Sequence, residues 1–198
     1  MMSEKRPITP EQEPDRETLL QFLRGKGAAR VGHSERDLLE HLWHTSEILR
    51  GWALPAWVCT AGLFHSVYGT EVFTQKLIPL QEREELRALI GRRAEKLVYC
   101  FSVLRRAALF SALKPGQLPP FIVARATGHR IYLAPGRMTE LCCLLAANWL
   151  EQQPRRPASL RARDFTDYLA LAGSLPPAAR RAMENEIAGT SSPASTRP

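Results

Sequence analysis

Apolar residues recur every three to four positions along most of this chain, and glycine or proline separates one such segment from the next. This spacing places apolar side chains on one face of an α-helix, and glycine and proline are typical of helix ends. The pattern predicts an all-α fold. The expected helices cover residues 19–23, 38–50, 56–64, 79–90, 92–113, 139–152, 164–172 and 177–188.

One stretch departs from the helical pattern. Residues 121–133, FIVARATGHRIYL, contain two short runs of β-favouring residues on either side of Thr127-Gly128. Such runs around a turn are typical of a hairpin, so we expect one small β-hairpin here.

The two ends of the chain differ from its middle. Residues 1–14 are rich in proline and charge, and residues 189–198, GTSSPASTRP, have low complexity. We expect a flexible N-terminus, a single helical domain over residues 15–188 and a disordered tail. A chain of 198 residues with 44% hydrophobic residues is large enough for one domain with a substantial core.

The sequence also bears on where the chain works. No segment approaches the ~20 consecutive apolar residues of a membrane helix, and the N-terminus lacks the apolar region of a secretory signal. The four cysteines form no CxxC pair, which favours buried, reduced thiols over a zinc ribbon or disulfides. We therefore expect a cytoplasmic protein that does not enter a membrane.

The net charge of +7 raises the question of nucleic-acid binding. The basic residues are scattered along the chain, whereas a nucleic-acid-binding protein usually concentrates them on one face or arm. No recognised DNA- or RNA-binding motif is present. We expect a small-molecule substrate as the partner, and the sequence leaves the oligomeric state open.

Three polar residues interrupt the apolar faces of different predicted helices. His41 lies on the apolar face of 38–50, His65 ends the apolar run AGLFH, and Asn148 lies on the apolar face of 139–152. Burying such a group without a partner costs about 1–3 kcal/mol. The three side chains therefore either hydrogen-bond within the core or converge on a common ligand such as a metal ion, for which imidazole is a frequent ligand.

The surroundings of the two histidines resemble the HD superfamily of helical proteins. The resemblance rests on LEH at 39–41 and LFHS at 63–66. The segments 33–45 and 61–73 more closely resemble an uncharacterised HD-like family that has HS in place of HD. The resemblance covers roughly residues 15–185. It implies an HD-like helical domain, and the superfamily includes metal-dependent phosphohydrolases and mixed-valent diiron oxygenases.

The resemblance also implies roles for individual residues. His41 matches the first metal ligand of the superfamily, His65 matches the histidine of the HD pair, and Asn148 lies roughly where the last aspartate is expected. Ser66 and Asn148 stand where the superfamily has carboxylates, so two negative charges are lost. A dinuclear centre would then be poorly neutralised.

A mononuclear site is the alternative that we expect. His33, His41, His65 and Glu71 supply three imidazoles and one carboxylate, a set that suits a single divalent iron or zinc ion with a position open for water or substrate. The enzyme would then be an HD-like hydrolase or oxygenase. The metal-free alternative is a ligand-binding, accessory or interaction protein with a degenerate HD site.

Further residues complete the expected site. Ser66 and Tyr68 are the candidate catalytic hydroxyls, and without a metal His33 or His65 would act as the general base. Ser34, His44 and Asn148 are expected beside the substrate or behind the metal ligands.

Overall fold

The computed structural model describes residues 15–33, 36–114, 116–156 and 158–191. The chain is mostly α-helical with a small antiparallel hairpin, which confirms the expected fold class. The elements in chain order are α1 (Arg16–Gly25), η1 (Ala28–Arg30), β1 (Gly32–His33), β2 (Arg36–Asp37), α2 (Leu38–Gly51), α3 (Ala56–Phe64), η2 (Leu80–Glu82), α4 (Arg83–Val103), α5 (Arg106–Ala112), β3 (Phe121–Val123), β4 (Arg130–Tyr132), α6 (Pro135–Gln152), η3 (Gln153–Arg155), α7 (Ala158–Ala172) and α8 (Pro177–Ser191).

Helix α3 is buried on nearly all sides, since every residue from Val58 to Phe64 is buried. A helix that is apolar all round belongs in a core, and α3 packs against α2, α4 and α6. Gly62 allows the close approach to α2, because a Cβ at this position would lie 2.5 Å from Leu49 Cδ1 and 3.3 Å from Ser46 Cα. The last turn of α3 is thereby fixed against α2.

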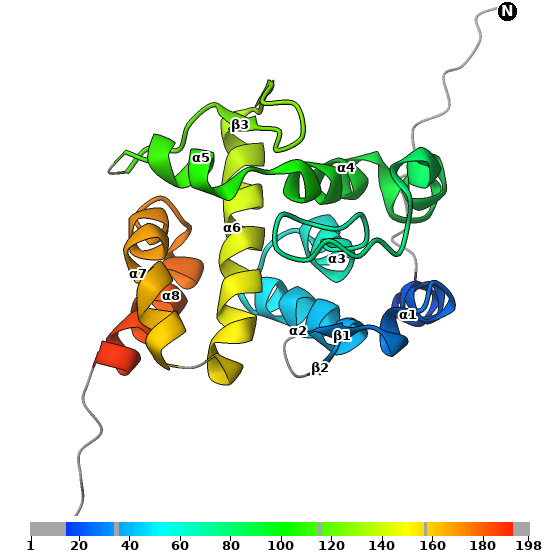
Figure 1. The fold of residues 1–198 in the computed structure, drawn as a ribbon, viewed down its shortest axis with the longest axis horizontal. Helices are drawn as coiled ribbons and strands as arrows, with labels where there is room; N and C mark the ends of the chain where they lie inside the picture. Colours follow the sequence, from blue (N-terminus) through cyan, green and yellow to red (C-terminus); the bar gives the residue numbers. More distant parts are fainter. Residues whose placement is uncertain (1–14, 34–35, 115, 157, 192–198) are drawn as a thin grey trace, which may run out of the picture.

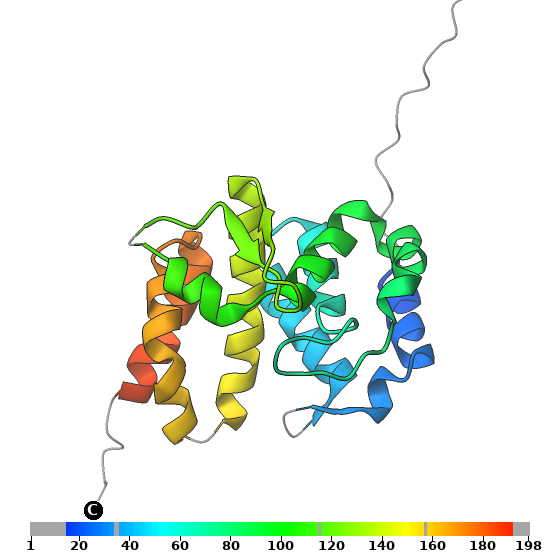
Figure 2. The same ribbon diagram turned by 45° about the horizontal axis from the view of Figure 1, so that its top comes forward.

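Helix α6 stands at the centre of the molecule (Figure 1). Pro135 begins the helix, where its fixed φ suits the first turn and its missing N–H costs nothing. On one side α6 contacts α2, α3 and α4. On the other side it contacts α7 and α8, which pack against each other (Figures 1 and 2). This position makes α6 the natural meeting point for side chains from α2 and α3.

The hairpin lies where the sequence predicts it. Phe121 pairs with Tyr132, Ile122 with Ile131 and Val123 with Arg130 in antiparallel register. A second antiparallel pair, β1 and β2, precedes α2 and is only two residues long in each strand.

The hairpin explains one wrong helix boundary. The expected helix over 92–113 is interrupted, because the Arg105 N–H donates to Val123 O and the Arg125 N–H donates to Val103 O. Leu104 adopts an extended conformation there, and α4 ends before it. These pairings connect residues about 20 positions apart, so local periodicity could not predict them.

Other boundaries shift by several residues. The helices expected over 79–90 and 92–113 join into α4 across a kink at Gly91, whose φ of 79° a side chain would strain. Helix α6 begins at Pro135 rather than 139, and α7 begins at Ala158 rather than 164. Helix α8 reaches Ser191, so residues 189–191 of the expected disordered tail are helical, while 1–14 and 192–198 lie outside the described residues.

Helix α2 begins at Leu38, as expected. Asp37 is the N-cap, and its Oδ1 accepts a hydrogen bond from Glu40 N at 2.8 Å. Ser34, which we expect beside the substrate or behind the metal ligands, lies outside the described residues.

In the part of the chain that the structure describes, no helix combines the length and apolar character needed to cross a membrane.

Candidate functional site

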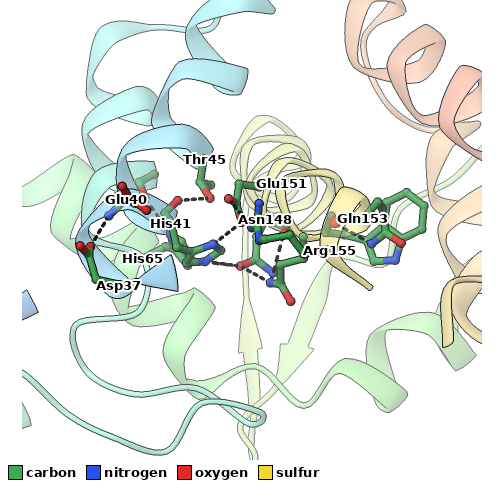
Figure 3. A network of polar contacts seen from close by, with 12 residues as sticks. Asp37, Glu40, His41, Thr45, His65, Asn148, Glu151, Gln153 and Arg155 are labelled. Atoms are coloured by element: carbon green, nitrogen blue, oxygen red, sulfur yellow. Dashed lines mark hydrogen bonds and ion pairs between the residues drawn. The ribbon is translucent and has the colours of Figure 1, made fainter. Parts of the chain in front are cut away.

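His41 lies on α2 with its side chain completely buried. Its position on the apolar face of α2 directs the imidazole at α6. There its Nδ1 lies 2.5 Å from Glu151 Oε2, and its Nε2 lies 3.1 Å from Asn148 Oδ1 (Figure 3). Both ring nitrogens of His41 are therefore engaged with α6.

His65 directly follows α3 and is also completely buried. Its Nδ1 donates a hydrogen bond of 2.7 Å to the backbone carbonyl of Gly62. Its Nε2 lies 3.1 Å from His41 Nε2 and 3.0 Å from Asn148 Oδ1 (Figure 3). The ring of Phe101 on α4 makes an edge contact with the imidazole and completes its apolar surroundings.

Three atoms from three helical segments thus form a compact triangle: His41 Nε2, His65 Nε2 and Asn148 Oδ1. Its sides measure 3.0–3.1 Å. The amide of Gln152 donates to both Oδ1 and the backbone oxygen of Asn148, at 3.3 and 3.2 Å. This interaction holds the amide oxygen of Asn148, an acceptor, toward the two imidazoles.

Protonation of the two rings follows from their outer partners. A backbone carbonyl only accepts hydrogen bonds, so His65 carries a proton on Nδ1 where it meets Gly62. Burial raises the pKa of the Glu151 carboxyl, but the hydrogen bond from His41 and the charge of Arg155 outweigh burial and lower that pKa below its usual range. Glu151 is therefore an ionised acceptor, and His41 also carries its proton on Nδ1.

Three lone pairs meet at the centre of the triangle. With both Nδ1 atoms protonated, neutral rings direct the lone pairs of both Nε2 atoms and of Asn148 Oδ1 toward one point. Such an arrangement is repulsive unless positive charge lies there, either as a proton on one Nε2 or as a metal cation. For metal–ligand bonds of about 2.1 Å, two ligand atoms lie about 3.0 Å apart at the right angles of an octahedral site and about 3.4 Å apart in a tetrahedral site, so the triangle has the octahedral spacing.

The hydrogen bonds that the two Nδ1 atoms make are also typical of metal-binding histidines. Such histidines generally donate their second N–H to a carboxylate or a backbone carbonyl, which fixes the tautomer and the ring orientation. His41 does so to Glu151 and His65 does so to Gly62. Arg155 in turn bonds Glu151 Oε1 at 2.5 Å and holds that carboxylate in place.

A pocket of about 310 Å³ opens beside Asn148, and neither His41 nor His65 lines it. Asn148 and Gln152 belong to both the pocket wall and the polar cluster. The pocket is also lined by Ser66, Thr70, Phe73 and Arg106.

The structure brings together only part of the expected metal site. No cluster of three or more His, Cys, Asp or Glu side chains suited to a metal occurs among the described residues. The expected ligand Glu71 is exposed, and its Oε2 accepts from the backbone N–H of Arg106 at 2.9 Å, so it caps α5 instead of joining the histidines. The side chain of His33, the fourth expected ligand, lies outside the described residues.

Of the other expected residues, some lie at the triangle or its pocket and the rest lie elsewhere. Ser66 lines the pocket and Asn148 joins the triangle. The Tyr68 hydroxyl instead donates to Glu95 Oε1 at 3.2 Å, and Tyr68 does not line this pocket, so its hydroxyl is directed away from the triangle. Burial raises the pKa of that hydroxyl far above its ordinary value. His44 is exposed and lines a different surface pocket with Glu40, so it does not lie behind the ligands.

The sequence reasoning missed Glu151, Gln152 and Arg155. Their spacing from Asn148 is three, four and seven residues, which places them on one face of the end of α6 and the η3 turn that follows it. This periodicity is the signal in the sequence that could have identified them as neighbours of Asn148.

Comparison with known proteins gives one partial match. A family model described as "Domain of unknown function (DUF6817)" matches residues 22–106. The match includes both histidines and ends before α6, which supplies Asn148 and Glu151. No curated protein and no solved structure matches the chain.

Proposed function

We propose that this protein is a metal-dependent hydrolase with one zinc or iron ion held by His41 Nε2, His65 Nε2 and Asn148 Oδ1. The observation that carries the proposal is the triangle of three acceptor atoms 3.0–3.1 Å apart, formed while both Nδ1 atoms donate outward. A small ester or phosphoester entering the pocket is the proposed substrate.

The donor set fits zinc or iron better than magnesium or calcium. Imidazole nitrogen suits the borderline transition metals, whereas magnesium and calcium require mainly oxygen ligands, several of them carboxylates. A divalent ion at such a site acts as a Lewis acid and lowers the pKa of bound water to about 7. Because all three proposed ligands are neutral, they leave the charge of the ion uncompensated, which favours hydrolysis over the carboxylate-rich dinuclear chemistry.

The chain's own residues prepare the site. Glu151 and the Gly62 carbonyl hold the protons of His41 and His65 on Nδ1, which keeps both Nε2 lone pairs available. Gln152 keeps the Asn148 oxygen turned inward. Ser66 lines the pocket, where its hydroxyl would hydrogen-bond a substrate.

We extend the proposal to the fold family and the compartment. The chain order His41, His65, Asn148, carried by α2, the end of α3 and α6, supports an HD-like helical domain in which serine and asparagine replace two carboxylates. The four cysteines are buried free thiols, which supports a reducing, cytoplasmic setting.

Elemental analysis of the full chain, purified without a metal-affinity step, tests the proposal. We expect about one zinc or iron ion per chain in the wild type and less than about a tenth of that in His65→Ala and Asn148→Leu. The control is His44→Ala, since His44 is exposed on the same helix as His41 and makes none of these contacts.

Other outcomes separate the alternatives. Failure of the wild-type chain to take up zinc, iron or cobalt after dialysis against these ions would overturn the proposal and leave the metal-free ligand-binding protein. Retained iron with substrate-dependent dioxygen consumption would replace the hydrolase by the oxygenase.

A further inference from the structure

Among the described residues, Arg106 is the cationic one in the wall of the pocket that opens beside Asn148. It begins α5, and its guanidinium lies over the ring of Phe101, with Cζ 5.6 Å from the ring centroid. The same ring makes the edge contact with His65. One aromatic side chain therefore separates the guanidinium from an imidazole of the triangle.

Arg106 differs from other partly buried arginines in the groups that surround its guanidinium. Arg83 and Arg155 pair with the buried carboxylates of Glu95 and Glu151. No carboxylate of a described residue lies within ion-pairing distance of the Arg106 guanidinium, although Glu71 accepts from its backbone N–H. A guanidinium in a pocket wall without a counter-charge favours an anionic ligand that presents two oxygens.

Ser66 provides a second, independent observation. The residue is 2% exposed, it lines the same pocket, and no hydrogen bond joins its hydroxyl to another described residue. Its Oγ is not among the fully buried side-chain atoms of the described residues that lack a partner, which indicates that the hydroxyl faces the pocket. Thr70, by contrast, already accepts from the Phe73 N–H at 3.0 Å. The Ser66 hydroxyl is therefore a polar group of the wall that can donate to a ligand, as can the O–H of Thr70.

We infer that Arg106 and Ser66 form an oxyanion subsite, so that the ligand of this pocket carries a carboxylate or a phosphoryl group. The assignment of this ligand as a substrate rests on the proposed function; the anion subsite itself does not. The pocket volume of about 310 Å³ lies at the lower end of the range for ligand pockets, which restricts the ligand to a small molecule.

Isothermal titration with inorganic phosphate and, separately, with acetate tests the inference. Each titration uses the full chain both as purified and after dialysis against EDTA, so that binding to a metal ion is separated from binding to Arg106. We expect Arg106→Gln to weaken binding of the preferred anion by at least about tenfold and Ser66→Ala by several-fold, in both preparations. Arg106→Lys, which keeps the charge and loses the planar fork, should lie between wild type and Arg106→Gln.

Arg105→Gln is the matched control, because Arg105 precedes Arg106 in the chain and its side chain is exposed. It should bind within about twofold of wild type, and a metal content of Arg106→Gln equal to wild type would show that the variant is folded at the site. Preference for phosphate identifies a phosphoryl ligand, and preference for acetate identifies a carboxylate. Equal loss of binding in Arg105→Gln and Arg106→Gln, or no binding of either anion by wild type, would overturn the inference.

The two proposals fail separately. Arg106-dependent anion binding in a chain without metal would preserve the subsite and reject the hydrolase. A stoichiometric metal ion with anion binding that Arg106→Gln leaves unchanged would reject the subsite and preserve the metal site.

Discussion

The carboxylate of Glu151 accepts a hydrogen bond from His41 Nδ1 at 2.5 Å across the interface of α2 and α6, although 110 residues separate the two in the chain. Both side chains are almost inaccessible to solvent, and Arg155 holds the other carboxylate oxygen. This contact fixes the tautomer and orientation of His41. It thereby connects the packing of two helices to the chemistry proposed for the site.

Glu151→Gln tests that connection. The amide keeps an acceptor for His41 but removes the charge that Arg155 neutralises, so we expect metal affinity to fall by about 10- to 100-fold. The free energy of unfolding should fall by about 1–3 kcal/mol, as for loss of a buried charged hydrogen-bond partner. Competition with a chelating dye and urea unfolding measure the two quantities.

Glu140→Gln is the matched control for this prediction. Glu140 lies on the same helix and pairs with Arg137, outside the candidate site. Its replacement should leave metal affinity unchanged. Equal losses of affinity in both variants would contradict a specific role for Glu151.

Asn148→Asp tests the charge of the site. A carboxylate in place of the neutral amide adds one negative charge beside the two Nε2 atoms, so we expect tighter binding of divalent ions than in wild type. The same charge should reduce turnover of any ester that is hydrolysed, because it offsets the Lewis acidity of the ion. Metal titration and a panel of chromogenic esters measure the two effects. Unchanged or weaker metal binding would place Asn148 outside the ligand set.

Glu95 provides a prediction for acid stability away from the candidate site. Burial raises the pKa of its carboxyl, but hydrogen bonds and charges from Arg83 and Arg87 outweigh burial and lower that pKa below the usual value. A lowered carboxyl pKa contributes stability above the unfolded-state value of about 4.5, and this contribution is lost as pH falls through the folded-state value. Wild type should therefore lose stability progressively below about pH 4.5.

Glu95→Gln isolates that contribution. At pH 7 we expect a loss of roughly 2 kcal/mol, less than for a fully buried pair because both arginines are partly exposed to solvent. The difference from wild type should shrink as pH falls toward 3, as measured by urea unfolding at each pH. A difference that is constant with pH would contradict the assignment.

Gly62→Ala tests the contact of α3 with α2. The added methyl group would meet Leu49 Cδ1 at 2.5 Å and Ser46 Cα at 3.3 Å, so we expect a loss of about 1–3 kcal/mol in unfolding free energy. Gly136→Ala in the first turn of α6 meets no atom within 4 Å and should be neutral or stabilising by up to about 1 kcal/mol. Equal effects in the two variants would contradict the close approach.

The sequence predicted the helices better than their ends. The helical periodicity around Leu42 and Leu145 reports burial along each helix, and that burial is local information. The interruption after Val103 depends on the pairing of Arg105 with Val123, which only the folded chain brings together. The local sequence pattern therefore could not predict this interruption.

The candidate site shows the same division. His41, His65 and Asn148 were singled out because each interrupts an apolar face, and the structure brings their polar atoms within 3.1 Å. Glu71 and Tyr68 were singled out by closeness in sequence to His65. The turn after α3 directs Glu71 to the start of α5 and Tyr68 to α4. Metal binding itself stays a prediction.

Anomalous X-ray diffraction from crystals of the full chain, recorded on both sides of the zinc and iron absorption edges, tests the metal site most directly. We predict one anomalous peak about 2.0–2.3 Å from His41 Nε2, His65 Nε2 and Asn148 Oδ1. Crystals soaked in either ion that show no peak there, with the two Nε2 atoms still in hydrogen-bond contact, would contradict the account.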